Sequence, residues 1–252
     1  VSPAGDLIDT LKAAGQFNTF IKAADETNLT GLLKTNSNLT VFVPTDAAFA
    51  ALPAGVPVYA AGRAVMDAIV GFPIHRGILA IARRAPLPPP GPFLAALPED
   101  ALVLGLIGLA NHDNVGGIFR NAAAFGADAV LLDETSCDPL YRKAIRVSVG
   151  GALVVPFTRA GPAPALIGSL RVAGFEILSL SPSGREPLSR IRRWGRTALL
   201  LGAEGPGLPS ALMAETRTVT IPMSGGFDSL NVATTSGIAL YELTRREPEN
   251  VP

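Results

Sequence analysis

The chain has 252 residues, of which 48% are apolar and only 17% are charged, and its formal net charge is zero. This composition predicts one large or two small folded domains, excludes a largely disordered chain, and gives no global charge signal for a nucleic-acid partner. The longest apolar runs fall well short of the ~20 residues that span a bilayer. The N-terminus has no signal-peptide pattern, and the single cysteine, Cys137, excludes an internal disulfide, so we expect a cytoplasmic protein.

The first part of the chain predicts a small α+β segment. Apolar residues in 6–25 recur at helical spacing on both sides of Gly15, which predicts two short helices. A third short helix, a strand at 40–43 and a helix capped near Thr45 or Asp46 follow. The stretches LIDTLKAAGQFNTFIKA, TNLTGLLK and TVFVPTDAAFAALP resemble the opening of a fasciclin-like domain. The resemblance ends at residue 55, so we expect a truncated fasciclin-like segment at 1–55.

After residue 55 the character of the chain changes. Residues 56–84 predict a strand, a helix and a second strand. APLPPPGPF at 85–93 holds five prolines, which predicts a semi-rigid linker over 85–98 and neither a helix nor a central strand. From 99 to 252, alternating segments predict an α/β domain with a mostly parallel sheet and helices. Strands are expected at 101–109, 128–132, 152–157, 175–180, 197–201 and 217–221, and helices at 115–125, 138–147, 163–173, 208–214 and 229–245.

Three loops, each after a predicted strand, combine glycines with polar side chains. They are NHDNVGGIFRNAAAFG at 111–126, LLLGAEGPGLP at 199–209 and IPMSGGFDSLN at 221–231. Glycines at such places let the backbone approach another group closely. The G-x-G-x-x-G fingerprint, a phosphate-loop lysine and a G-x-S-x-G elbow are absent, and the two histidines lie far apart. A dehydrogenase, a nucleoside triphosphatase, a hydrolytic triad and a metal site are therefore not supported.

The three loops, in this order, are similar to three motifs of the SpoU/TrmH branch of the SPOUT RNA methyltransferases, over 101–245. Residues 57–84 also resemble the tail of the small substrate-binding domain that often precedes the catalytic domain there. The resemblance implies an S-adenosylmethionine-dependent enzyme that methylates a ribose 2′-hydroxyl of rRNA or tRNA. It also implies a trefoil-knotted α/β fold at 99–252, although chains as a rule avoid threading. A homodimer through the knotted domain, with no metal and no membrane partner, completes the expectation.

The resemblance also assigns roles to residues of the loops. The catalytic candidates are Arg120, Asn114, Asn231 and Ser229. Arg120 is expected to orient a phosphate, because arginine keeps its proton at neutral pH and is therefore a poor base; the alternative is a surface residue on an alanine-rich helix. Asn114 is expected to contact the ribose and to cap helix 115–125, Asn231 to contact the site, and Ser229 to cap the last helix. The cofactor-binding candidates are Gly202, Glu204, Gly205, Gly207, Ile221, Met223 and Leu230, against the alternatives of a tight glycine turn and an ordinary core.

Other interpretations stay open from the sequence. Five arginines crowd into GREPLSRIRRWGR at 184–196, which indicates either a solvated surface or a phosphate-contacting patch. The front of the substrate-binding domain has no counterpart in the chain, and a fasciclin-like fragment stands in its place. A cofactor- or RNA-binding module without turnover is therefore one alternative to the enzyme, and a fasciclin-like adhesion protein is another.

Overall fold

The computed structural model describes residues 7–26, 28–35, 46–50, 63–70, 83–224 and 229–245. The chain divides into two compact units, Val1–Arg84 and Ala85–Pro252. Among the described residues, no helix has the length and apolar character that crossing a membrane requires.

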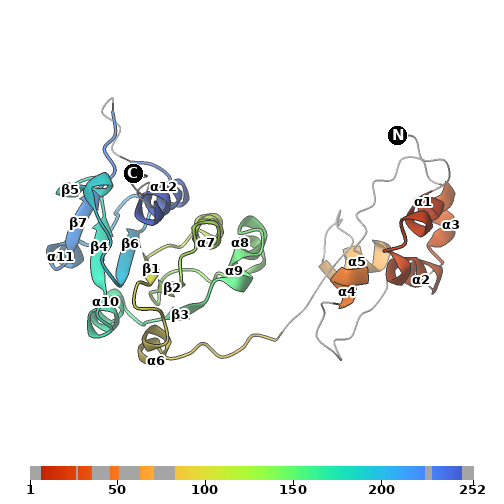
Figure 1. Ribbon diagram of the computed structural model, residues 1–252, viewed down its shortest axis with the longest axis horizontal. Helices are drawn as coiled ribbons and strands as arrows, with labels where there is room; N and C mark the ends of the chain where they lie inside the picture. Colours follow the sequence, from red (N-terminus) through yellow and green to blue (C-terminus); the bar gives the residue numbers. More distant parts are fainter. Residues whose placement is uncertain are drawn as a thin grey trace, which may run out of the picture. The chain divides into compact units, whose positions relative to one another are not determined.

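The first unit contains short helices. The two helices expected around Gly15 are α1 (Leu7–Ala14) and α2 (Asn18–Glu26), and they are followed by α3 (Thr30–Thr35), α4 (Asp46–Ala50) and α5 (Arg63–Val70) (Figure 1). Asp46, the first residue of α4, accepts the backbone N–H groups of Asn18 at 3.0 Å and Thr19 at 2.7 Å. Asp46 therefore caps the start of α2. The strands expected at 40–43 and within 56–84 lie outside the described residues.

A seven-stranded sheet forms the centre of the second unit. Its order is β3-β2-β1-β6-β4-β7-β5, and every neighbouring pair is parallel, which confirms the expected α/β class. In the register, Ile107 at the end of β1 lies beside Gly202 at the end of β6. The loops that leave these two strands therefore start side by side. The strands are β1 (Leu102–Ile107), β2 (Ala129–Leu132), β3 (Phe157–Arg159), β4 (Glu176–Leu180), β5 (Glu186–Pro187), β6 (Thr197–Gly202) and β7 (Arg217–Thr220).

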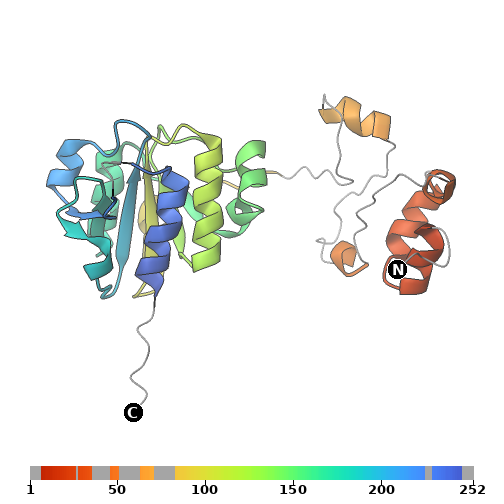
Figure 2. The same ribbon diagram turned by 90° about the horizontal axis from the view of Figure 1, so that it is seen from above.

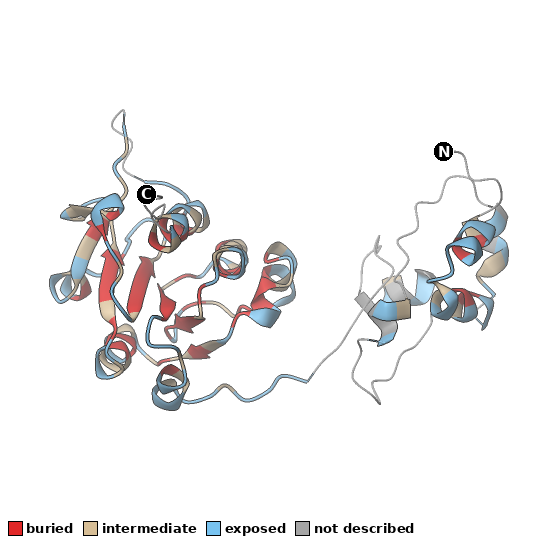
Figure 3. Cartoon of the chain, in the orientation of Figure 1, coloured by how far each residue is buried: buried red, intermediate tan, exposed pale blue. Residues whose placement is uncertain are grey.

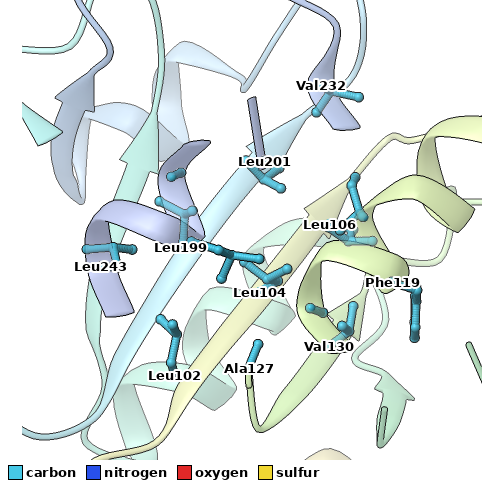
Figure 4. Packing of buried hydrophobic residues seen from close by; sticks show 14 of the residues in the cluster. Leu102, Leu104, Leu106, Phe119, Ala127, Val130, Leu199, Leu201, Val232 and Leu243 are labelled. Atoms are coloured by element: carbon cyan, nitrogen blue, oxygen red, sulfur yellow. The ribbon is translucent and has the colours of Figure 1, made fainter. Parts of the chain in front are cut away.

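Helices cover both faces of the sheet, as expected, and two hydrophobic cores result (Figures 1 and 3). Leu104 and Leu106 of β1 point into one core (Figure 4), whereas Val103 points into the other, because successive side chains of a strand alternate between faces. The first core is covered by α7 (His112–Phe125), α9 (Gly151–Val154) and α12 (Val232–Thr244). The second is covered by α6 (Pro90–Ala95), α10 (Ala163–Val172) and α11 (Ser210–Ala214). Helix α8 (Arg142–Val147) packs on α7.

Two sequence-based expectations are wrong in this unit. Residues 90–95 of the proline-rich stretch form helix α6, with Leu94 fully buried. Prolines are tolerated there because the first-turn N–H groups of a helix need no intrahelical partner. The strand expected at 152–157 is instead helix α9 followed by β3. Gly151 lies so close to α7 that a Cβ on it would be 2.7 Å from the Phe119 carbonyl oxygen, a tertiary contact that no periodicity reveals.

Smaller differences concern helix ends. Helix α8 begins at Arg142, four residues later than expected, because Asp138 opens a turn in which its carboxylate accepts the N–H of Leu140. Helix α7 begins at His112, three residues early, and α12 begins at Val232, three residues late. The trefoil knot stays a prediction.

Candidate functional site

Two asparagines fix where the helices of the site begin, and both differ from the expected caps. Asn111 caps α7, since its Oδ1 accepts the N–H of Asp113 at 2.9 Å. Asn231 caps α12, since its Oδ1 accepts the N–H groups of Ala233 at 3.0 Å and Thr234 at 3.1 Å. The expected caps, Asn114 and Ser229, are therefore wrong: Asn114 lies inside the first turn of α7, and Ser229 is an exposed residue before α12.

The freed side chain of Asn114 joins a polar cluster that contains one residue from each of the three loops. Its Nδ2 donates to Glu204 Oε1 at 2.5 Å. Asn231 Nδ2 donates to Asn114 Oδ1 at 2.9 Å and to Glu204 Oε1 at 3.2 Å. Asn114 is only 5% exposed, so both of its polar atoms need these partners. The cluster lies at the C-terminal edge of the sheet, where open α/β sheets bind ligands.

A second group of side chains holds the loop between β1 and α7. Asp133 Oδ2 accepts the N–H of Gly108 at 3.1 Å, and Ser136 Oγ accepts the N–H of Leu109 at 3.1 Å. Asp133 Oδ1 in turn accepts the N–H of Ser136 at 2.7 Å. Both side chains are buried, so they fix the backbone that leads into Asn111. Neither residue is predicted by the three loop motifs, although an acid directly after the apolar strand β2 is a signal that points to this edge.

The loop after β6 folds back on itself. Gly207 donates its N–H to the Ala203 carbonyl at 3.0 Å, and Gly205 and Gly207 have φ values of 85° and 68°. Side chains other than glycine rarely adopt this left-handed backbone. A Cβ on Gly202 would lie 2.4 Å from Gly207 C and Leu208 N. The alternative that these glycines permit a tight turn therefore holds, and it leaves residues 204–207 exposed at the edge.

The remaining cofactor candidates lie on the segment that joins β7 to α12. Ile221 is partly buried and packs against the first core. Met223 is also partly buried, whereas Leu230 is 47% exposed. Helix α12 is pinned along α7 (Figure 2), because Asn121 Nδ2 donates to the Ala233 carbonyl at 2.7 Å. This contact brings Asn231 to Asn114.

Arg120 does not join the cluster within one chain. It is exposed on α7, six residues after Asn114. Six residues correspond to a rotation of about 240° and a rise of about 9 Å along a helix, so the two side chains leave α7 in directions about 120° apart. Asn114, Glu204 and Asn231 are thus brought together, and Arg120 faces elsewhere.

Two of the five arginines in 184–196 serve the fold. Arg193 donates to the Asp100 carbonyl, and burial lowers the pKa of its guanidinium. Arg196 donates to the carbonyls of Leu97 at 2.6 Å, Pro98 at 3.1 Å and Ala173 at 3.0 Å. These two side chains therefore belong neither to a solvated surface nor to a phosphate-contacting patch, the two interpretations of 184–196 from the sequence. They fasten the segment that connects α6 to β1.

Other chemistry finds little support at this edge. Within the described part of the chain, no three histidines, cysteines or acids are grouped so that they would hold a metal ion. Cys137 is half-buried, and burial raises the pKa of its thiol. A thiol that stays protonated at neutral pH is a poor nucleophile.

Comparison with known proteins identifies the class. The sequence profile of the SpoU rRNA Methylase family matches residues 101–241, which include all three loops. The profile of the Fasciclin domain matches residues 15–60. The chain belongs to the SpoU rRNA methylase family of methyltransferases.

Individual relatives agree with this family. An "uncharacterized tRNA/rRNA methyltransferase" of Mycobacterium bovis is 45% identical over 197 residues, which cover 76% of this chain and 67% of that protein. The 23S rRNA (guanosine-2′-O-)-methyltransferase RlmB of Acinetobacter baylyi is 30% identical over 77% of this chain and 80% of that protein. The AdoMet-bound rRNA methyltransferase from Sinorhizobium meliloti superposes with a TM-score of 0.56 at 28% identity. That match covers 62% of this chain and 60% of the solved chain.

Proposed function

We propose that this protein is an S-adenosylmethionine-dependent RNA methyltransferase that transfers a methyl group to a ribose 2′-hydroxyl of rRNA or tRNA. The observation that carries the proposal is the hydrogen-bonded cluster of Asn114, Glu204 and Asn231. These residues come from three different loops, with Asn114 and Asn231 separated by 117 residues in the sequence. The AdoMet in the S. meliloti structure supports the cofactor, and the relative that acts on guanosine-2′-O supports the ribose.

The residues of the edge fit the cofactor. The exposed residues 204–207 have backbone groups that can bind the cofactor, and the Glu204 carboxylate attracts a positive sulfonium. Ile221, Met223 and Leu230 supply partly exposed apolar surface for a flat adenine ring. The bound cofactor would supply an activated methyl group. With Gly202, Gly205 and Gly207 shaping the loop, these seven residues are the proposed cofactor site.

Asn114 and Asn231 are the proposed substrate side. Methyl transfer depends more on alignment of the hydroxyl with the methyl group than on strong acids or bases. The amide of Asn231 is held at both ends, by the cap of α12 and by Asn114 with Glu204. A pair of fixed amides orients a hydroxyl without adding charge. Ser229, exposed two residues before Asn231, is proposed to contact the substrate at the same edge.

Arg120 completes the site in a homodimer. Within one chain it faces away from Asn114, so we assign it to the site of a second copy, where its planar donor fork holds an RNA phosphate. Ile238 and Tyr241 on α12, beside α7, are 41% and 57% exposed. They supply apolar surface for the interface.

The domain boundaries form part of the proposal. We assign 1–55 to a truncated fasciclin-like segment, 56–84 to a remnant of a substrate-binding domain and 99–252 to the catalytic domain. An alignment that covers 76% of 252 residues begins at or before about residue 61, so likeness to the M. bovis relative extends into 56–84. The proline-rich stretch 85–98 is proposed to connect the units, with α6 as its fixed end.

The decisive experiment supplies the full chain with isotopically labelled S-adenosylmethionine and total rRNA and tRNA, followed by nuclease digestion and mass spectrometry. We expect label in a 2′-O-methylated nucleoside. Label on a base would refute ribose specificity. Cofactor binding by calorimetry without any labelled RNA would favour the binding module without turnover, and detection of the chain outside the cell would favour adhesion.

The composite site has its own test. Arg120→Ala and Asn114→Ala should each be inactive as pure dimers. After the two variants are mixed and allowed to exchange subunits, a heterodimer contains one site with both residues intact, so activity should return. If mixing restores nothing although exchange is complete, Arg120 does not act across subunits.

A further inference from the structure

Helix α8 presents a row of cations beside the candidate site. Arg142, Lys143 and Arg146 are all exposed, and Tyr141 occupies the position just before the helix with 44% of its surface exposed. At 100° per residue, the three basic side chains fall within one arc of about 100°. Ala144, on the other side of the helix, is fully buried against α7. We call Tyr141, Arg142, Lys143 and Arg146 the basic ridge.

The basic ridge is tied to the first turn of α7, which carries Asn114. Lys143 Nζ lies 2.7 Å from Asp113 Oδ2. The rings of Tyr141 and His112 have centroids 4.4 Å apart at an interplanar angle of 45°. Helix α8 and α7 lie side by side in Figures 1 and 2. The ridge therefore adjoins the edge where the three loops meet.

We propose that the basic ridge binds the RNA strand that flanks the methylated nucleotide. In this inference, which rests on the proposed function, Arg142 and Arg146 contact consecutive phosphates and Tyr141 with His112 provides a stacking surface for one base. Single-stranded nucleic acid is held in this way, by cations along its backbone and aromatic rings against its bases. Arg142 and Arg146 are one helical turn apart on the same row, a spacing at which both reach one strand.

The nearby acids leave the ridge with a positive balance. Asp113 is paired with Lys143. The carboxylate of Asp138 accepts the N–H of Leu140 in the turn before α8. Against these two acids stand Arg142, Lys143 and Arg146, with Arg120 on the neighbouring helix α7. A polyanion therefore complements the charge of this face better than a protein partner with a surface of mixed charge would.

The test measures the affinity of the full chain for a fluorescently labelled single-stranded RNA of mixed sequence at several salt concentrations. For the double variant Arg142→Gln/Arg146→Gln, the slope of log affinity against log salt should fall in magnitude by about 1.4, since each phosphate contact on a single strand contributes about 0.7. Tyr141→Ala should weaken binding at least about fivefold, whereas Tyr141→Phe, which keeps the ring, should not.

The matched control is Arg185→Gln/Arg190→Gln, which removes two exposed arginines from the segment 184–196. An equal loss of slope in this control, unchanged binding by the ridge variant, or a ridge variant that changes only the oligomeric state in sedimentation would each overturn the inference. Calorimetric binding of S-adenosylmethionine should be the same in all variants. Failure of the wild type to bind that cofactor would overturn the proposed function instead.

Discussion

Asn231 caps helix α12 and also donates a hydrogen bond to Asn114, and two different substitutions should distinguish the contributions of these interactions. Asn231→Ala removes the cap of α12, whose two acceptor bonds measure 3.0 and 3.1 Å. Loss of such a cap costs about 1 kcal/mol. The same change removes the donor to the nearly buried Asn114 Oδ1, and an unpaired buried acceptor costs about 1–3 kcal/mol. The free energy of unfolding should therefore fall by about 2–4 kcal/mol.

Asn231→Ser is the matched variant, because serine caps a helix about as well as asparagine but does not offer the amide donor. Its free energy of unfolding should be about 1 kcal/mol higher than that of Asn231→Ala. For a unit of this size, that difference raises Tm by about 2–4 °C in thermal denaturation followed by circular dichroism. Both variants should lose methyl transfer, since both lack the donor to Asn114 and Glu204.

Two results would contradict this reasoning. If Asn231→Ser is as unstable as Asn231→Ala, the cap contributes nothing to α12. If Asn231→Ser transfers methyl groups at the wild-type rate, the amide is not part of the site, and the cluster has only a structural role.

Three further predictions concern other parts of the chain. Gly202→Ala should abolish calorimetric cofactor binding, because its Cβ would meet backbone atoms at 2.4 Å that no rotamer change relieves; Gly168→Ala, where a Cβ meets nothing within 4 Å, should bind normally. Cys137 should react with iodoacetamide more slowly in the folded than in the unfolded chain at mildly alkaline pH, because burial raises the pKa of its thiol. The stability that this raised pKa contributes is lost as pH rises through the folded-state pKa. Equal rates in the folded and unfolded chains would refute the burial of the thiol. The N–H groups of Thr19 and Asn18 lower the pKa of Asp46, so the protection of these two amides against hydrogen exchange should fall as pH drops through that lowered value, and Asp46→Asn should abolish this pH dependence.

Much of the secondary structure could be predicted from the sequence, because local residue patterns determine it. The alternation of apolar strands and amphipathic helices after residue 99 predicted six strands, five of which the structure has near the expected places. The three loops identified the family through their resemblance to its motifs. Glycine at 205 and 207 is also the residue type that the left-handed backbone there requires. Likewise, the two helices around Gly15 follow from apolar spacing alone.

Tertiary contacts decided the rest. Whether 151–154 is strand or helix depends on the close approach of Gly151 to α7. Helix α6 begins with proline and is stabilised by the burial of Leu94. The helix caps also differ from those expected from the sequence. Asn231 caps α12 because its side chain accepts the N–H groups of Ala233 and Thr234, whereas Asn114 bonds to Glu204, 90 residues away, and does not cap α7. The sequence names the residues of a polar cluster, but only the packing of α12 on α7 brings their hydrogen-bonding atoms within reach of each other.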